Sequence, residues 1–217
     1  MALTLYAHPF SSYCQKVLIA LYENCVAFEY RMLVTDEVAA ELASLWPLKR
    51  FPVLVDEGRT IVEASIIIEH LGLHRPGPVR LIPEDPVAAL DVRMMDRIFD
   101  NYVMTPVQKV VSDAIRAPDV RDAHGVAKAR AMLGTAYSWL DTRMASREWA
   151  AGDGFTLADC AGAPALFYAD WTHPIGKEFR NLRSYRQRLN ARPAFARAID
   201  EARPYRALFP LGAPDRD

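Results

Sequence analysis

A proline-rich stretch divides the sequence into two halves and strongly limits how the chain can fold. Residues 76–86 read PGPVRLIPEDP, with four prolines in eleven residues. Proline lacks the backbone N–H that helices and central strands need, so neither element can run through this segment. We therefore expect a first domain at residues 1–75, a linker at 76–86 and a second domain at 87–217.

The first half alternates between strand and helix patterns. Short apolar or alternating segments predict strands at residues 3–7, 28–34, 51–55 and 59–63. Apolar residues at helical spacing predict helices at 14–24, 37–45 and 64–71, the last of them closed by Gly72. The resulting order, β-α-β-α-β-β-α, predicts an α/β domain.

The second half carries helical patterns alone. Asp85 and Pro86 are typical of a helix start. Apolar side chains then recur at helical spacing, at Val87, Leu90, Met94, Ile98 and Tyr102, and again at Leu133, Tyr137, Leu140 and Met144. Thr156 and Asp159 have the spacing of a capping box, which gives the Asp159 carboxylate a structural role on backbone N–H groups. We expect an all-α domain as far as Leu208.

Composition excludes several classes of protein. The net charge is −1, so no global field attracts nucleic acid or an anionic membrane, and we interpret the arginine-rich stretch at 177–206 as a solvated helix face. Three cysteines encode no disulfide framework, which favours a reducing compartment. Neither a signal-peptide pattern nor an apolar run of membrane length is present. We expect a cytoplasmic protein without a metal.

The stretch HPFSSYCQKV, residues 8–17, places Ser11 where a Cys-x-x-Cys motif with Cys14 would have its first thiol. A thioredoxin-type domain holds that thiol at a helix N-terminus, where backbone N–H groups and the helix dipole favour a thiolate. Serine without a base is a poor nucleophile, but its hydroxyl can donate a hydrogen bond. We infer that Ser11 stabilises the thiolate of a bound ligand. Cys14 is predicted to be buried, and Cys25 and Cys160 to pack as small hydrophobic residues.

Four segments together resemble a known family. HPFSSYCQKVLIAL is similar to the first helix of serine-type glutathione S-transferases, nearest to phi-like and zeta-like bacterial members. WPLKRFPVL, VEASIIIEHL and the closing TLAD and LxxYxxRLxxRPxFAR patterns resemble the same family in the same order. The resemblance implies a thioredoxin-like domain that binds glutathione, an all-α second domain and a homodimer. It also implies a detoxification enzyme that conjugates glutathione to small hydrophobic electrophiles.

The resemblance also implies individual roles. Ser11 is the catalytic residue, Pro52 a cis-proline, Arg50 a contact of the glycyl carboxylate and Glu63 a contact of the γ-glutamyl end. The implied glutathione-binding residues are Arg50, Phe51, Pro52, Val53, Glu63, Ala64 and Ser65. Ala64 departs from the family serine, whose hydroxyl binds the γ-glutamyl carboxylate, and we expect Ser65 to compensate.

The electrophile should bind between the two domains. Candidates for an apolar wall are Phe10, Phe99, Tyr102, Val103, Met104 and Trp171, although ordinary helix packing explains the same residues. Two alternatives to a transferase remain open. One is a non-catalytic member that binds glutathione or other proteins, and the other is a glutathione-dependent thiol-disulfide oxidoreductase that uses Cys14.

Overall fold

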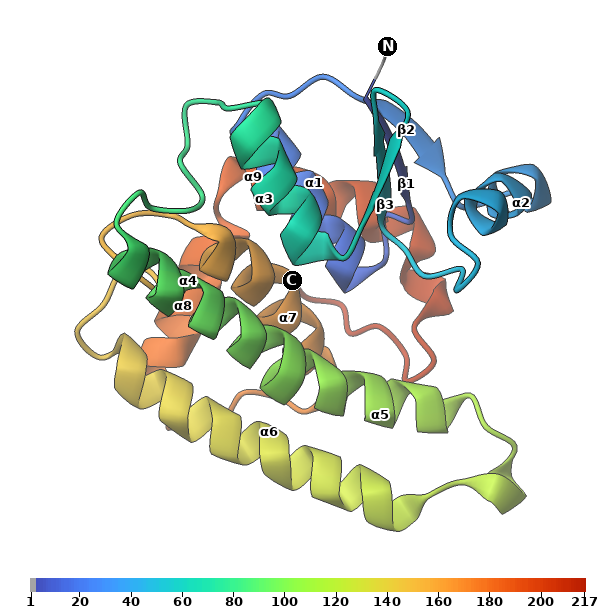
Figure 1. Ribbon diagram of the computed structural model, residues 1–217. Helices are drawn as coiled ribbons and strands as arrows, with labels where there is room; N and C mark the ends of the chain where they lie inside the picture. The colour runs from blue at the N-terminus through green and yellow to red at the C-terminus, as the bar shows by residue number, and fades with distance from the viewer. Residues whose placement is uncertain (1–2) are drawn as a thin grey trace.

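The computed structural model describes residues 3–217 and shows a sheet-containing domain followed by a helical one (Figure 1). The sheet has four strands, β1 (Thr4–Ala7), β2 (Glu29–Met32), β3 (Val53–Asp56) and β4 (Arg59–Val62), in the order β2-β1-β3-β4. β1 is parallel to β2 and antiparallel to β3, and β3 is antiparallel to β4.

Three helices surround this sheet in the predicted order. α1 (Ser12–Glu23) and α3 (Ala64–His74) lie on one face, and α2 (Asp36–Leu45) lies on the other (Figure 1). Val17, Leu18 and Leu21 form the predicted apolar face of α1 and are fully buried. The predicted β-α-β-α-β-β-α domain is therefore confirmed.

The strand register brings three chain segments to one end of the sheet. Tyr6, near the end of β1, pairs with Val53 at the start of β3. Val53 pairs in turn with Val62, the last residue of β4. The loop after β1, the loop before β3 and the start of α3 therefore meet at this end, although they are far apart in the sequence.

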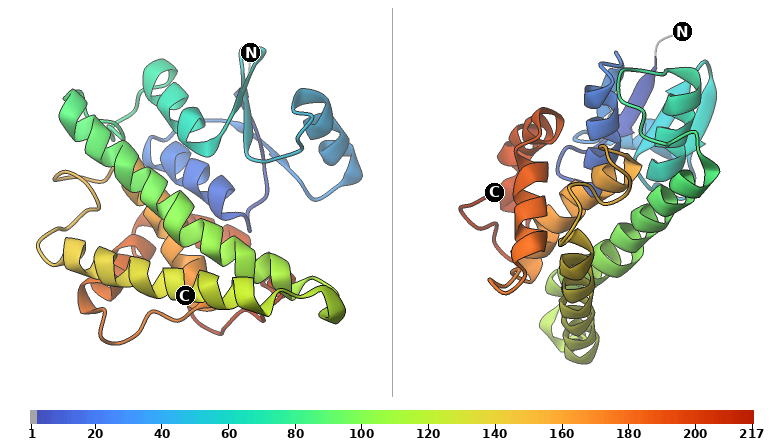
Figure 2. Two further views of the ribbon diagram at one scale, coloured as in Figure 1. Left: turned by 60° about the horizontal axis from the view of Figure 1, so that its bottom comes forward. Right: turned by 90° about the vertical axis from the view of Figure 1, so that its left-hand side faces the viewer.

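The second domain contains helices and turns in its described part, as predicted. Its elements are α4 (Pro86–Ile98), the π-helix η1 (Phe99–Met104), α5 (Thr105–Ala114), the 3-10 turn η2 (Pro118–Val120), α6 (Ala123–Met144), α7 (Leu157–Thr172), α8 (Arg180–Asn190), α9 (Pro193–Ala202) and the 3-10 segment η3 (Arg203–Leu208). α7 is buried along its whole length and contacts α1, α4 and α8, while α9 also contacts α1 (Figure 2). Between the domains, residues 75–85 contain no helix or strand.

The capping box at the start of α7 is confirmed. Asp159 is fully buried and accepts hydrogen bonds from the N–H groups of Ala150 and Thr156, each at 2.9 Å. The hydroxyl of Tyr185 donates to the same carboxylate at 2.6 Å. Asp159 therefore links the first turn of α7 to α8 and has a structural role.

Two local predictions in the first domain are wrong. Gly72 does not close α3, because the helix continues to His74. A glycine inside a helix costs only about 1 kcal/mol. The last turn is held by the contact between the tilted rings of His70 and His74 and by the hydrogen bond from Arg75 to Asp56. Cys25 is exposed rather than packed, because it follows α1 in a turn with φ of 51°.

The predicted apolar row at the start of the second domain faces solvent rather than the core. A helix forms there as predicted, but Val87, Leu90 and Met94 are exposed. α4 packs instead through Ala89, Val92 and Met95, which are buried. The helical period was right, but burial follows the apolar residues on the face of α4 that packs against α7.

Two arginine side chains of the 177–206 stretch lie over aromatic rings. The guanidinium of Arg186 lies 5.7 Å from the centroid of the Phe167 ring, and that of Arg197 lies 3.8 Å from the Tyr22 centroid. Such contacts combine cation–π attraction with packing of the aliphatic stem.

Candidate functional site

Ser11 is the N-cap of α1, at the end of the sheet where the three segments meet. Its backbone is extended, and its side-chain oxygen accepts the N–H of Cys14 at 3.5 Å. A hydroxyl that accepts in this way keeps its own proton for donation. The first turn of α1 contains no acidic residue, so the positive end of the helix dipole is not neutralised by a side chain of that turn. The surroundings of Ser11 therefore favour an anion.

The loop that carries Ser11 is held in place by α7. The side-chain amide of Gln15, which is fully buried, donates to the Pro9 carbonyl at 3.0 Å and to the Tyr168 hydroxyl at 3.2 Å. The Tyr168 hydroxyl in turn donates to the Phe10 carbonyl at 3.2 Å. The second domain thus fixes the position of Ser11, a contribution that sequence reasoning missed because Gln15 and Tyr168 match no motif.

The loop before β3 has the backbone that the family resemblance implied. The Phe51–Pro52 peptide bond is cis, which confirms the prediction for Pro52. Val53 begins β3 and is fully buried, while Phe51 and Arg50 are exposed. Within residues 3–217, Arg50 has no salt-bridge partner, so its guanidinium is available to a ligand.

Glu63 precedes α3 with an unusual backbone conformation. Its φ of 70° and ψ of 117° are rare for a residue other than glycine, and strain of this kind is concentrated at functional sites. The Glu63 side chain is exposed and forms no hydrogen bond to the first turn of α3. Ala64 follows at the helix start and is buried. The helix N-terminus therefore lacks a side-chain cap from its own N-cap residue.

Ser65 does not replace the hydroxyl that Ala64 lacks. Its hydroxyl donates to Asp96 Oδ2 at 2.8 Å, and its oxygen accepts from Lys16 Nζ at 3.0 Å and from Arg97 Nη2 at 2.6 Å. A serine has one proton to donate, and here Asp96 accepts it. The Ser65 hydroxyl is therefore not free to replace the hydroxyl that Ala64 lacks.

Ser65 belongs instead to a buried charged cluster between the domains, which consists of Lys16, Ser65, Asp96, Arg97 and Asp100. Lys16 in α1 is 1% exposed, forms a salt bridge with Asp96 and donates to Asp100 Oδ2 at 2.9 Å. Arg97 closes the cluster from its more exposed side with a bond of 2.6 Å to Asp100.

Burial affects the titration of Asp100 in this cluster. It raises the pKa of Asp100 above its ordinary value, and the neighbouring Lys16 opposes that shift without cancelling it. Sequence reasoning assigned Ser65 to glutathione and missed the four charged residues, because their spacing, from α1 to η1, forms no local pattern. The cluster places the first turn of α3 against both α1 and α4.

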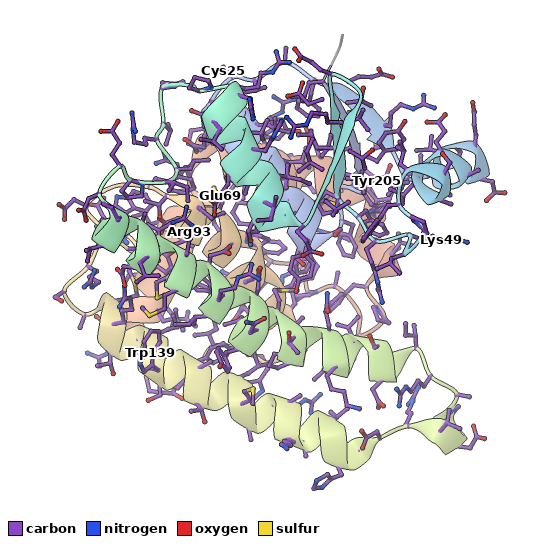
Figure 3. All side chains as sticks on the ribbon, in the orientation of Figure 1. Cys25, Lys49, Glu69, Arg93, Trp139 and Tyr205 are labelled. Carbon is purple, nitrogen blue, oxygen red and sulfur yellow. The ribbon has the colours of Figure 1, made fainter. Side chains whose placement is uncertain are left out.

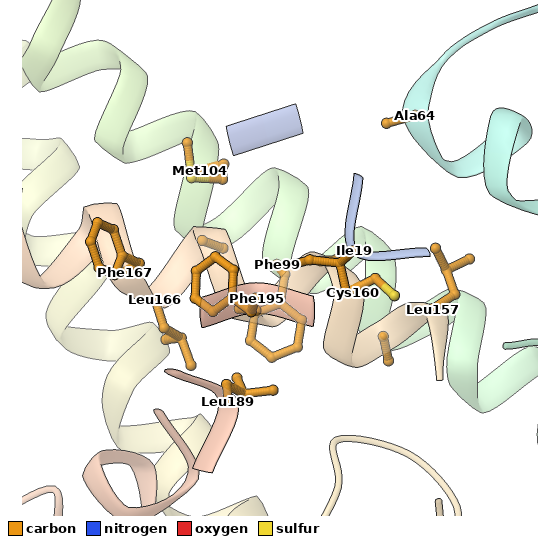
Figure 4. Packing of buried hydrophobic residues seen from close by; sticks show 14 of the residues in the cluster. Ile19, Ala64, Phe99, Met104, Leu157, Cys160, Leu166, Phe167, Leu189 and Phe195 are labelled. Atoms are coloured by element: carbon orange, nitrogen blue, oxygen red, sulfur yellow. The ribbon is translucent and has the colours of Figure 1, made fainter. Parts of the chain in front are cut away.

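The residues predicted to form an apolar wall do not all lie where a ligand could reach them. Phe10 and Trp171 do lie together, with ring centroids 6.4 Å apart, and Tyr102 is exposed on η1. Phe99 and Val103 are fully buried, so they contact core residues rather than a ligand, and Met104 has only 5% of its surface exposed. Figure 4 draws Phe99 among Phe195, Leu189 and Cys160.

The chemistry of the cysteines differs from that of a redox site. Cys14 has no exposed surface, and burial raises its pKa to about 12 although its Sγ accepts a hydrogen bond from the His8 N–H at 3.4 Å. Cys160 is also buried, and burial raises its pKa. Among residues 3–217, no group of three His, Cys, Asp or Glu side chains is arranged to hold a metal ion.

Comparison with known proteins places this geometry in a family. Residues 5–78 match the model of the glutathione S-transferase N-terminal domain, and residues 102–193 match that of its C-terminal domain. A glutathione S-transferase from Methylobacterium radiotolerans, solved in complex with glutathione sulfonate, is 29% identical with a TM-score of 0.80, covering 92% of this chain and 95% of that one.

Two curated relatives have names that do not describe transferases. The FtsZ-localized protein A of Caulobacter vibrioides is 28% identical, with 88% of each chain covered. A stringent starvation protein A homolog of Coxiella burnetii is 26% identical, with 92% of each chain covered. None of the helices in the described chain has the length and hydropathy to cross a membrane. The two family models cover both domains in the order that the fold shows, and the chain belongs to the glutathione S-transferase family.

Proposed function

We propose that this protein is a serine-type glutathione transferase that joins the glutathione thiolate to small hydrophobic electrophiles. The observation that carries the proposal is the position of Ser11. It caps α1 at the end of the sheet where the cis-proline loop and the start of α3 also lie. A thiol bound there faces a hydroxyl donor and a helix N-terminus, which are the groups that stabilise a thiolate.

The energies are sufficient for this role. A hydrogen bond to a charged group contributes about 1.5–3 kcal/mol and a helix terminus about 0.3–1 kcal/mol. Each pKa unit corresponds to about 1.4 kcal/mol. Together the two interactions therefore lower the pKa of a thiol from an ordinary value near 8.5 to about 6–7. The thiolate then becomes a major form at neutral pH. Further acceleration comes from holding the thiolate beside the electrophile.

The remaining glutathione contacts follow from the same arrangement. We assign the glycyl carboxylate to exposed Arg50 and the cysteinyl backbone to Val53 after the cis-proline. The γ-glutamyl group is assigned to Glu63 and to the N-terminus of α3 at Ala64 and Ser65. The solved relative with bound glutathione sulfonate supports a glutathione site in this fold. Half-buried Phe10 and exposed Tyr102 are the best-placed contacts for an electrophile, because Trp171, like Met104, is buried.

Conjugation of glutathione to a panel of aryl halides, enones and epoxides tests the proposal. Ser11→Ala should lower the rate by about ten- to a hundredfold, the equivalent of the lost hydrogen bond to the thiolate. Retention on immobilised glutathione should persist in this variant. The matched control is Ser138→Ala, which removes an exposed hydroxyl from α6. Full activity of Ser11→Ala would contradict the assigned role.

A non-catalytic member of the family is the second candidate. Two observations favour it: Ala64 lacks the hydroxyl expected at the γ-glutamyl site, and the proton of Ser65 is donated to Asp96. The names of the Caulobacter and Coxiella relatives are also consistent with functions other than conjugation. Retention on glutathione without turnover of any electrophile would favour this candidate.

The oxidoreductase alternative is the weakest of the three. A thiol nucleophile must be accessible and partly ionised near neutral pH. Cys14 is fully buried with a pKa raised to about 12, so it satisfies neither condition.

We further infer a cytoplasmic homodimer that associates through α3 and α4. Exposed apolar side chains lie on both helices, at Ile66, Leu73, Val87, Leu90 and Met94. The two helices are neighbours, since Arg93 in α4 binds Glu69 in α3 at 2.7 Å (Figure 3 labels both). A second copy is the partner that the family implies for this surface. Light scattering should give twice the mass of one chain, and Leu90→Glu should halve it.

A further inference from the structure

A cleft in the second domain lies outside the proposed glutathione site. It has a volume of about 810 Å³ and is bounded by the end of α7, the loop at 174–177, α8 and residues 216–217. None of its lining residues comes from the sheet domain or from the segments around Ser11. A volume of this size is typical of pockets for organic ligands of moderate size.

Basic side chains dominate the walls of this cleft. Its cationic lining residues are Lys177, Arg180, Arg183, Arg186 and Arg216, and its acidic lining residues are Asp170 and Asp217. The whole protein has a net charge of −1, so this excess of positive charge is local. Concentrated charge of one sign in a concave surface raises the local concentration of the opposite ion.

The two acids do not neutralise the outer part of the cleft. Asp170 is shared by Arg186 and Arg216, at 3.5 and 3.2 Å, and both acid–base contacts lie on the α7 side. Asp217 pairs with Arg203 and Arg206, which are not lining residues. These acids partly neutralise the inner wall of the cleft, where Arg186 Nη2 is buried without a hydrogen-bond partner among the described residues.

The outer wall has unpaired cations. Lys177 and Arg180 are exposed and form no salt bridge with any residue of the described chain, and Arg183 donates only to the Ile175 carbonyl, at 2.9 Å. The Glu178 carboxylate lies beside the lining residue Gly176 and forms no salt bridge with any described residue. The backbone N-terminus of α8 adds little, because the Leu182 N–H already donates to Asp141 at 2.9 Å. Recognition in this cleft therefore depends on side chains.

We propose that the cleft binds a small organic molecule with more than one phosphate group. Guanidinium groups bind phosphate through two parallel hydrogen bonds, and Arg180 and Arg183 are one helical turn apart on α8. The cleft is too large for a single phosphate ion, which favours an organic molecule that carries the phosphate groups. The buried contacts of Arg186 supply a preformed floor.

Calorimetry with ATP and with inorganic tripolyphosphate, on the full chain, tests the proposal. Both probes should bind with an affinity that decreases as salt is added. ATP should bind more tightly than tripolyphosphate if the organic part occupies the remaining volume, and equal affinity would overturn the organic part of the proposal. The Arg180→Ala, Arg183→Ala double variant should weaken binding by about tenfold or more, because it removes two charge-assisted contacts.

The control is Arg147→Ala, which removes an exposed positive charge at a position that does not line the cleft. The Arg147→Ala variant should bind both probes with the affinity of the parent protein. Circular dichroism should show the same fold in all variants. An equal loss in the control would mean attraction by general surface charge and would overturn the proposal. So would the absence of binding at millimolar probe, or tighter binding of a hexaglutamate peptide than of either phosphate probe.

Discussion

Lys16 in α1 and Asp100 in η1 form a buried ion pair across the two domains, with 2.9 Å between Lys16 Nζ and Asp100 Oδ2. Lys16 also binds the hydroxyl of Ser65 in the first turn of α3. One side chain thus joins the helix that Ser11 caps, the helix that begins at Ala64 and the second domain. The position of the proposed γ-glutamyl site therefore depends on packing between the domains.

Lys16→Met should destabilise the protein by about 3–5 kcal/mol, because it leaves Asp96 and Asp100 buried without their main counter-charge. Urea unfolding measures this loss. Lys128→Met is the matched control, since Lys128 is exposed on α6, and it should change stability by no more than about 0.5 kcal/mol. A loss below about 1 kcal/mol for Lys16→Met would mean that water replaces the pair at little cost.

Ala64→Ser should tighten glutathione binding by about 0.5–1.5 kcal/mol, because it restores a donor at the N-terminus of α3. Ser65 cannot already supply this donor, since its proton is bonded to Asp96. Calorimetric titration of glutathione measures the change. An unchanged affinity would place the γ-glutamyl carboxylate elsewhere.

Arg50→Ala should raise KM for glutathione more than it lowers kcat. A contact with the distant glycyl carboxylate is equally strong in the ground and transition states, so its loss affects binding alone. The difference from the parent protein should shrink at high salt. Arg59→Ala is the control, because Arg59 lies at the end of β4 that is far from Val53 and the proposed site. It should leave both constants unchanged. A fall in kcat at constant KM would assign Arg50 to the chemical step.

Cys25 should be the thiol that reacts rapidly with a disulfide reagent in the native protein. It is exposed, whereas Cys14 and Cys160 are fully buried and burial raises the pKa of each thiol. Titration with Ellman's reagent should show one fast equivalent at neutral pH and two more on unfolding. Cys25→Ser should remove the fast equivalent, and its persistence would show that a buried thiol opens to solvent.

Stability should fall on acidification in part through Asp56. The bond from Arg75, at 2.7 Å, and then the contact with His70 lower the pKa of this carboxyl below its ordinary value of 3.8. A carboxyl with a lowered folded pKa stabilises the protein above the ordinary pKa and loses that contribution as pH falls below about 4.

Comparison of urea unfolding at pH 5 and pH 3 tests the role of Asp56. Asp56→Asn should be less stable at pH 5 and should lose less stability between the two values than the parent protein. Glu57→Gln is the control, because Glu57 is exposed and lies 3.7 Å from the same arginine. An identical loss in Asp56→Asn and the parent would assign the acid sensitivity to other carboxyls.

The sequence by itself determined the break in helix and strand at residues 76–85, the order of strands and helices in the first domain and the helical second domain. Each of these follows from local chemistry: proline removes N–H donors, strand and helix periods are read over a few residues, and Thr156 with Asp159 forms a cap within one turn. Family resemblance added Ser11 and the cis bond at Pro52, the second of which the structure confirms.

Tertiary structure decided which of these residues meet and which face water. Lys16, Ser65 and Asp100 are brought together by the packing of α1, α3 and η1, and no local pattern records such a contact. The apolar row at Val87, Leu90 and Met94 and the core position of Phe99 depend likewise on what lies opposite each helix. Helical periodicity identifies a face, but burial depends on the neighbour that covers it, and that neighbour is distant in the sequence.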